Sequence, residues 1–309
     1  ISGLQRRFTF KNILFPFKVI HSIYVANKIV KKFSPDLVIG TGGYASGPLL
    51  YIAARKKIPS IIQEQNSFPG ITNKILSRYV NKVCVAYNNM ERFFEKDKIC
   101  FTGNPVRDQI LNFSSKRSES LKYFNLKESS LTVLVIGGSL GALSINNAIY
   151  KNLELLTKES INLIWQTGVS FSDKANKVIQ EINLPNFHSY DFIQNMDLAY
   201  AAADIIVSRA GAIAISELCC VGKPVILIPS PNVAENHQYK NAQSLVNKNA
   251  ALLVEDYKAN RKLVTKILEL INNATMRESL SNNILSLAVK DATNKIIEIC
   301  LNMINYESK

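Results

Sequence analysis

Four short turns carry the residues best suited to chemistry. Each follows an apolar run and places glycine and small polar residues where a helix would begin: "GTGGYASGP" (40–48), "GNPVR" (103–107), "GGSLGA" (137–142) and "SRAGAIAISE" (208–217). Glycine lets a backbone approach a ligand closely, and the first turn of a helix offers free N–H groups and about half a positive charge. Such turns are suited to binding a phosphate or diphosphate, although they also serve packing alone.

The turn at 137–142 is the most typical of a phosphate site. Ser139 adds a hydroxyl donor, and the helix expected from Ala142 would direct its N-terminus at the turn. The sequence matches neither G-x-G-x-x-G nor a Walker loop, which disfavours dinucleotide and P-loop chemistry.

Two charged residues stand beside these turns. Arg107 could clamp a diphosphate or form a surface salt bridge. Glu217 lies about two turns into an expected helix, where a carboxylate can accept both hydroxyls of a ribose or simply face solvent.

Amide side chains are concentrated in two segments, where they could recognise sugar hydroxyls and acetamide groups or cap helices. The first follows a strand-like run and contains Gln63, Glu64, Gln65, Asn66 and Asn73; in the second, Gln238 and Asn241 share one helix face. We find no catalytic triad or glycosidase-like carboxylate pair. The five scattered cysteines indicate reduced thiols. Together with only three histidines, they predict no metal site, and we expect no cofactor.

The elements that would position these residues are parallel βα units. Short apolar runs alternate with helical patterns from 36 to 111 and again from Leu131, and a region rich in serine and charge (112–130) separates the two series. A length of 309 residues also favours two domains. We expect an α/β fold of two Rossmann-like domains, 1–125 and 126–309, facing each other across a cleft, with helices from about residue 259.

The first 33 residues are basic and amphipathic. The formal net charge of the chain is +13, and residues 1–33 contain Lys and Arg but no Asp or Glu. An apolar stripe, interrupted only by Pro16, predicts a helix that packs on a core or rests on an anionic membrane surface; its residues are Phe10, Ile13, Leu14, Phe17, Ile20 and Tyr24. Apolar runs too short to cross a bilayer and the lack of a signal-peptide pattern favour a cytoplasmic location.

Seven motifs, in order from Ile1 to about residue 256, resemble the MurG family, the UDP-N-acetylglucosamine:lipid I N-acetylglucosaminyltransferases of bacterial peptidoglycan synthesis. They are "ISGL", "GTGGYASGP", "EQNSFPGITNK", "GNPVR", "GGSLGALSIN", "SRAGAIAISE" and "HQYKNA". The resemblance implies a GT-B fold, in which the first domain takes the lipid-linked acceptor and the second takes the nucleotide sugar. It also implies transfer of N-acetylglucosamine to the C4 hydroxyl of the muramoyl sugar, with inversion.

Site residues follow from the same resemblance. It implies that Ser139 and Arg107 meet the diphosphate, that Ile193 pairs with uracil through its backbone, and that Glu217 takes the ribose. The nucleotide would be lined by Ala212, Ile213, Ala214, Ile215 and Ser216; the sugar would meet Gln238 and Asn241; and further cleft positions would be Gly42, Gly43, Tyr44, Glu64, Asn66, Asn73, Asn146 and Arg209.

The expected partners are UDP-N-acetylglucosamine, lipid I and the anionic cytoplasmic face of the bacterial plasma membrane, and not nucleic acid. The residues expected at the membrane are Lys11, Ile13, Leu14, Phe17 and Lys18. The family's first strand and a glycine loop with a proposed catalytic histidine precede the point where this sequence starts. Gln63 also stands where many relatives have His, so the general base is unassigned and the first sheet is expected to be incomplete.

Two other kinds of function remain open. One is another GT-B enzyme, such as a diacylglycerol glycosyltransferase or a UDP-N-acetylglucosamine 2-epimerase. The other is a basic membrane-binding or nucleic-acid-binding module without activity.

Overall fold

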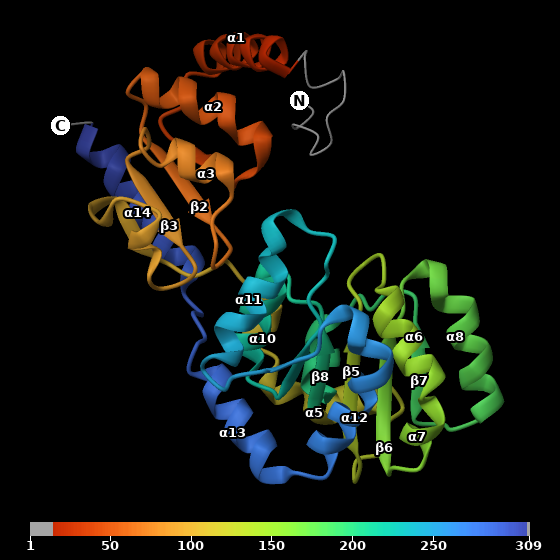
Figure 1. Ribbon diagram of the computed structural model, residues 1–309. Helices are drawn as coiled ribbons and strands as arrows, with labels where there is room; N and C mark the ends of the chain where they lie inside the picture. Colours follow the sequence, from red (N-terminus) through yellow and green to blue (C-terminus); the bar gives the residue numbers. More distant parts are fainter. Residues whose placement is uncertain (1–14, 308–309) are drawn as a thin grey trace. The chain divides into compact units, whose positions relative to one another are not determined.

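The computed structural model (Figure 1) describes residues 15–307 and divides the chain into two compact units. The first contains the residues up to Pro105 together with those from Asp291 onward, and the second contains Val106–Lys290. Three of the expected membrane residues, Lys11, Ile13 and Leu14, lie outside the described residues.

The first unit is built on a four-stranded parallel sheet in the order β1-β2-β3-β4. Its strands are β1 (Val38–Gly40), β2 (Ser60–Glu64), β3 (Lys82–Val85) and β4 (Ile99–Phe101). Its helices are α1 (Phe15–Phe33), α2 (Gly43–Arg55), α3 (Ile71–Leu76), η2 (Met90–Arg92), η3 (Lys96–Lys98) and α14 (Ala292–Glu307). Helices α2 and α3 pack on the sheet through a core that includes Leu50, Leu76 and Val83.

The second unit is built on a six-stranded parallel sheet in the order β10-β9-β8-β5-β6-β7. Its strands are β5 (Leu131–Ile136), β6 (Ile161–Gln166), β7 (Phe187–Tyr190), β8 (Ile205–Ser208), β9 (Val225–Leu227) and β10 (Leu252–Leu253). Its helices are α4 (Asp108–Leu111), η4 (Ser114–Lys116), α5 (Arg117–Tyr123), α6 (Leu143–Lys151), α7 (Leu153–Thr157), α8 (Val169–Ile182), α9 (Met196–Ala202), α10 (Ala212–Val221), η5 (Ala234–Asn236), α11 (His237–Val246), η6 (Asp256–Lys258), α12 (Ala259–Ile271) and α13 (Ala274–Leu285).

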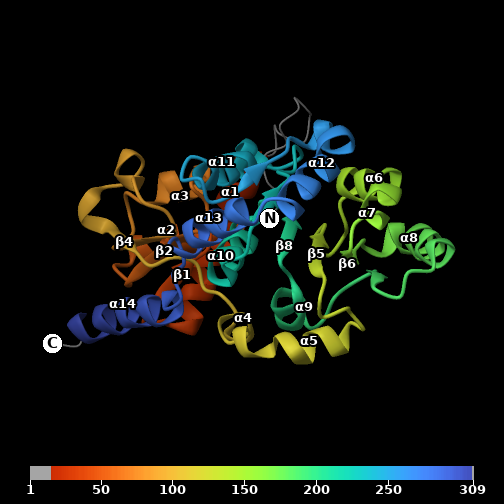
Figure 2. The ribbon, with the colours of Figure 1, turned by 90° about the horizontal axis from the view of Figure 1, so that it is seen from below.

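Both faces of this second sheet are covered. Side chains of a strand alternate between faces, so Val133 and Val135 of β5 join the core under α6, α8 and α12, while Leu134 and Ile136 join the core under α5, α9 and α10. In Figure 2, α6 and α12 lie above these strands, and α5 and α9 lie below them. The expected parallel α/β architecture is therefore present in both units.

The boundary between the units differs from the expected division at residue 125. Ile110, Phe113 and Phe124 are buried in the core of the second unit, so the segment that resembled a linker belongs to that unit. Arg117 strengthens the attachment because its guanidinium donates to the Asp204 carboxylate at 3.0 Å. At the other end, α14 belongs to the first unit and lies beside its sheet (Figure 2).

The described part of helix α1 runs from Phe15 to Phe33 and includes Pro16. Within residues 15–307, no helix combines the length and the apolar character that a membrane crossing requires.

Candidate functional site

In the second unit, the turns with candidate functional residues follow strands whose last residues are paired with one another. Ile136, the last residue of β5, is paired with Gln166 of β6 and Ser208 of β8, and Gln166 is paired with Tyr190 of β7. The turns after these strands therefore leave the sheet at the same edge. The strand order reverses beside β5, which is where open α/β sheets bind ligands.

The turn after β5 requires its glycines. Gly138 and Gly141 have φ values of 87° and 76°, which L side chains rarely adopt. A Cβ on Gly141 would lie 2.0 Å from the carbonyl oxygen of Thr167, because the turn after β6 packs directly against this backbone. Ser139 is exposed on the turn, immediately before α6. The turn thus combines glycine conformations that require glycine with an exposed serine, and its binding of an anion stays a prediction.

Gln166 joins this turn to the loop after β7. Its Nε2 donates to the carbonyl oxygen of Gly138 at 2.9 Å, and its Oε1 accepts from the backbone N–H of Ile193 at 3.1 Å. The Gln166 side chain is almost fully buried. Ile193, expected to read uracil through its backbone, thus has its N–H engaged by a side chain of the protein.

Arg107 and Glu217, expected to meet different parts of a nucleotide, lie in direct contact. Arg107 donates to Glu217 Oε1 from Nε at 3.0 Å and from Nη2 at 2.9 Å. The other carboxylate oxygen, Oε2, accepts from the hydroxyl of Tyr200 at 3.3 Å. Glu217 is buried, whereas the Arg107 side chain is 55% exposed. The guanidinium can therefore reach a ligand from solvent while it neutralises the carboxylate.

The first turn of α10 presents part of the expected nucleotide lining. Ala212, Ala214 and Ser216 are half-buried and Ile213 is 44% exposed. Ile215 differs, because its side chain points into the core of the second unit and is buried. The helical period explains the difference, because Ile215 shares one helix face with Leu218 and Cys219, which are buried in the same core.

Asn146 and Arg209 serve the fold in this structure. Asn146 is buried, donates to the carbonyl oxygen of Thr167 at 2.7 Å and accepts from the indole N–H of Trp165 at 3.1 Å. Arg209 donates to the Asp256 carboxylate at 2.5 Å and to Ser144 Oγ at 3.1 Å. Both side chains were expected in the cleft, and both are engaged by neighbours within the second unit.

The two amides expected at the sugar also differ from each other. Gln238 is half-buried, and its Oε1 accepts from the backbone N–H of Ser230 at 2.8 Å, which fixes the loop after β9. Asn241 is on the same helix but has no exposed surface. Of the pair, the structure presents only Gln238 to solvent.

In the first unit, the glycines of "GTGGYASGP" have separate roles. A Cβ on Gly40 would lie 2.2 Å from Leu50 Cδ1, so this glycine allows α2 to pack closely on β1. Gly42 and Gly43 have φ values of 90° and 73° and form the start of α2. Tyr44 is exposed in the first turn of the helix. The turn serves packing at its start and offers backbone N–H groups at its end.

Glu64 organises the amide segment and is not presented to solvent. One carboxylate oxygen accepts from the backbone and side chain of Asn66 at 3.0 and 3.2 Å, and the other accepts from Gly70 N at 3.2 Å and Asn73 Nδ2 at 2.7 Å. Asn73 is 2% exposed, and its Oδ1 has no hydrogen-bond donor among residues 15–307. A buried acceptor in this state costs free energy unless a ligand supplies a donor.

Gln63 lies in a buried amide network. Its Nε2 donates to Asn104 Oδ1 at 2.7 Å, its Oε1 accepts from Gln65, and Asn104 Nδ2 donates to the Gln65 carbonyl oxygen at 3.1 Å. The loop after β4 is thereby tied to the amide segment after β2.

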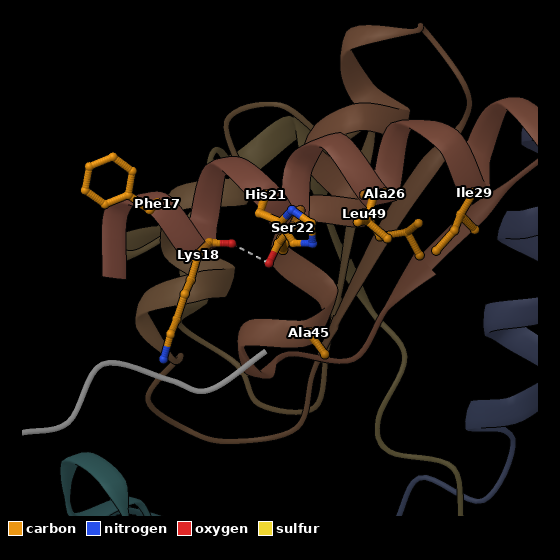
Figure 3. Close-up of a pocket in the computed structure, with 10 residues that line it drawn as sticks. Phe17, Lys18, His21, Ser22, Ala26, Ile29, Ala45 and Leu49 are labelled. Atoms are coloured by element: carbon orange, nitrogen blue, oxygen red, sulfur yellow. Dashed lines mark hydrogen bonds between the residues drawn. The ribbon is translucent and has the colours of Figure 1, made fainter. Parts of the chain in front are cut away.

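A groove of about 820 Å³ lies between α1 and α2 (Figure 3). Its lining is apolar except for Lys18, His21 and Ser22, and includes Phe17, Val25, Ile29, Ala45, Pro48 and Leu49. Ala26 and Val30 of α1 pack against Ile52 of α2, whereas Phe17 and Ile20 are 70% and 66% exposed. The described part of the apolar stripe expected on α1 is therefore largely exposed and not buried in the core.

Comparison with known proteins decides the family. The glycosyltransferase family 28 N-terminal domain matches residues 1–85, and the C-terminal domain of the same family matches residues 132–296. A protein of Flavobacterium psychrophilum is 46% identical over 307 residues, covering 99% of this chain and 83% of that protein. It is named UDP-N-acetylglucosamine--N-acetylmuramyl-(pentapeptide) pyrophosphoryl-undecaprenol N-acetylglucosamine transferase. The chain belongs to the MurG family of glycosyltransferases.

Solved structures agree with this membership. The crystal structure of Acinetobacter baumannii MurG has a TM-score of 0.77 and 26% identity, covering 93% of this chain and 79% of that chain. A UDP-GlcNAc 2-epimerase from Neisseria meningitidis has a TM-score of 0.67 at 17% identity, covering 97% and 83% of the two chains, and shares the fold alone. The two parallel-sheet units are those of the GT-B class, as the resemblance to the MurG family implied.

Two residues of this MurG-family site were missed by sequence reasoning. Gln166 had a signal, because a polar residue at the end of an apolar strand and before "TG" marks a ligand-facing edge. Tyr200 had none, since it lies in the apolar stretch "LAYAAAD" and resembles an ordinary core aromatic.

Proposed function

We propose that this chain transfers N-acetylglucosamine from UDP-N-acetylglucosamine to the C4 hydroxyl of the muramoyl sugar of lipid I, with inversion at the anomeric carbon. The observation that carries the proposal is the near-full-length identity of 46% to a protein named for this transfer. The arrangement of residues in each unit supports it.

The second unit is suited to the donor. The glycine turn at 137–142 and the N-terminus of α6 offer N–H groups to a diphosphate, with Ser139 and Arg107 as further donors. Charge develops on UDP as it leaves, so prearranged donors at this point would stabilise the transition state more than the ground state. The carbonyl oxygen of Ile193 would accept from N3 of uracil, and Glu217 would accept the ribose hydroxyls.

The first unit is suited to the acceptor. Gly42 and Gly43 begin a helix of 13 residues, whose N-terminus would face the diphosphate of lipid I. Asn73 brings an unsatisfied buried oxygen next to Gly42, since a Cβ on that glycine would lie 3.7 Å from Asn73 Oδ1. A hydroxyl or amide N–H of the acceptor would complete its hydrogen bonding. The C4 proton would pass to a general base, which is unassigned.

Helix α1 would rest on the cytoplasmic face of the plasma membrane as a peripheral contact. Phe17 and Ile20 would enter the interface, while Lys18 and its basic neighbours would face anionic headgroups, each adding roughly 1 kcal/mol near the surface. Such docking would bring the first unit to an acceptor that is itself anchored by a polyprenyl chain.

The test is product analysis with UDP-N-acetylglucosamine in the presence and absence of lipid I. We expect a disaccharide-linked lipid and UDP only when the acceptor is present. Conversion of the donor alone to N-acetylmannosamine and UDP would indicate an epimerase, and transfer to diacylglycerol would indicate a different glycosyltransferase.

Replacement of Arg107 or Glu217 by Ala tests the donor site. Each change should lower kcat/KM for UDP-N-acetylglucosamine by about tenfold or more, because a charge-assisted hydrogen bond contributes about 1.5–3 kcal/mol. Arg261→Ala, on an exposed position of α12, serves as the control. Near-normal kinetics in both site variants would refute these roles.

A further inference from the structure

Tyr200 places a hydroxyl in the core of the second unit. Its side chain is 3% exposed and lies on α9 among apolar residues such as Leu198 and Leu218. A buried hydroxyl costs free energy unless it is hydrogen-bonded, and this one donates to Glu217 Oε2 at 3.3 Å. Burial raises the pKa of Tyr200 above its ordinary value, with the Glu217 charge acting in the same direction, so the phenol keeps its proton and remains a donor.

The two oxygens of Glu217 are divided between two donors. Oε1 accepts from the partly exposed Arg107, and Oε2 accepts from the buried Tyr200. An ionised carboxylate has about four lone-pair sites, so both oxygens retain the capacity to accept from a ligand. The two contacts, one from the solvent side and one from the core, fix the plane of the carboxylate.

We propose that Tyr200 is a positioning residue that orients the Glu217 carboxylate toward the ribose of a uridine nucleotide. This inference rests on the proposed function and on no contact between Tyr200 and the nucleotide itself. Without the hydroxyl, Glu217 can turn both oxygens to the Arg107 guanidinium, the bidentate arrangement that such pairs favour. Glu217, which would accept from the ribose, and Arg107, which would donate to the diphosphate, would then be engaged with each other.

The test compares two ligands in the Tyr200→Phe variant of the full chain. Calorimetry gives Kd for UDP and for 2′,3′-dideoxy-UDP, which lacks the hydroxyls that Glu217 would accept. We expect Tyr200→Phe to weaken UDP binding by about threefold to tenfold, the size of one hydrogen bond, and to change dideoxy-UDP binding by less than about twofold. A general loosening of the core would weaken both ligands equally.

Two further variants make the comparison decisive. Tyr150→Phe removes a phenol hydroxyl from α6 and should leave both Kd values unchanged. The Tyr150 ring packs on Phe171, with 6.2 Å between the ring centroids. Tyr200→Met also fills the space without a hydroxyl and should reproduce the loss of discrimination.

Equal effects on the two ligands, or none on either, would overturn the positioning role. Loss of the fold in both Tyr200 variants would also overturn it, because the hydroxyl would then serve the core. If the unmodified protein binds no UDP, the proposed function itself fails. Binding of UDP by that protein, combined with unchanged selectivity in the variants, would refute only the inference about Tyr200.

Discussion

At the scale of single residues, chemical type was predictable and partnership was not. Arg107 and Glu217 stood out from their places beside glycine turns, and the structure brings them into contact. Arg209 was expected in the cleft only from the resemblance to the MurG family, and its guanidinium is engaged by Asp256, which follows it by 47 positions in the sequence. A local sequence pattern cannot predict such a partner, because a salt bridge between distant segments forms only once the sheet has formed.

The cysteines give a prediction at the same scale. Burial raises the pKa of the Cys84 and Cys219 thiols to about 12, so at pH 8 almost none of either is thiolate in the folded state. We expect a thiol-specific disulfide reagent at pH 8 to modify Cys300, which is only half-buried, well before these two. Cys300→Ala should therefore remove one thiol from the fast phase of labelling.

Cys84→Ala is the matched control and should leave that fast phase unchanged. Equal labelling rates for Cys84 and Cys300 in the native protein would contradict the burial argument.

At the scale of elements, amphipathic patterns identified helices but not what their apolar faces contact. The stripe on α1 was equally compatible with a core and with a membrane. The structure buries Ala26 and Val30 and leaves Phe17 exposed. A helix was expected to begin at the turn 40–48, and α2 begins at Gly43, where Gly42 and Gly43 have positive φ values.

Helix α1 carries a prediction about membrane binding. Phe17→Ser should lower binding to vesicles that contain phosphatidylglycerol by about tenfold, because burial of a Phe side chain contributes about 1.5–3 kcal/mol. Cosedimentation over a series of NaCl concentrations would measure it, and added salt should weaken the remaining electrostatic contribution. Val169→Ser removes a side chain of comparable exposure from α8 and should have no effect.

The ion pair that attaches η4 to α9 should depend on pH. Burial is the largest single influence on the pKa of Asp197 and tends to raise it, but the hydrogen bond from Lys116 at 2.6 Å, the charge of Lys116 and backbone hydrogen bonds together outweigh burial. The pKa of Asp197 is therefore below its ordinary value of 3.8. The pair therefore stabilises the fold above the ordinary pKa, and this contribution is lost as the pH falls through the lower, folded-state value.

Asp197→Asn should accordingly unfold at a lower urea concentration than the unmodified protein at pH 7, and the difference should shrink below about pH 4. Asp173→Asn changes an exposed carboxylate on α8 and should show little difference at either pH. A difference for Asp197→Asn that stays constant with pH would exclude the ion pair as its cause.

At the scale of the whole molecule, two parallel α/β units could be predicted from the alternation of strands and helices. The boundary could not, because residues 112–130 are rich in serine and charge, as linkers are, although Phe113 and Phe124 within them are buried. A few buried aromatic residues decide whether such a segment belongs to a unit, and the average composition of the segment does not reveal them.

Two fragments test this boundary. Residues 106–290 contain a complete two-layered core, so we expect them to unfold cooperatively by circular dichroism and to bind UDP as the full chain does. Residues 126–290 begin at the division expected from the sequence and lack α4 and α5, whose removal would expose the apolar surface under Ile110 and Leu121. That shorter fragment should be less stable or aggregate, and equal stability of the two would refute the assignment.

The chain leaves the first unit at Pro105 and returns to it at Asp291, so α14 completes a unit whose strands were made much earlier. During synthesis on the ribosome, at roughly 5–20 residues per second, the whole second unit emerges before that helix does. The sheet of the first unit is therefore exposed at the place where α14 will pack until the second unit has been synthesised. Chaperones can bind this exposed surface during that time, while the second unit is already able to fold.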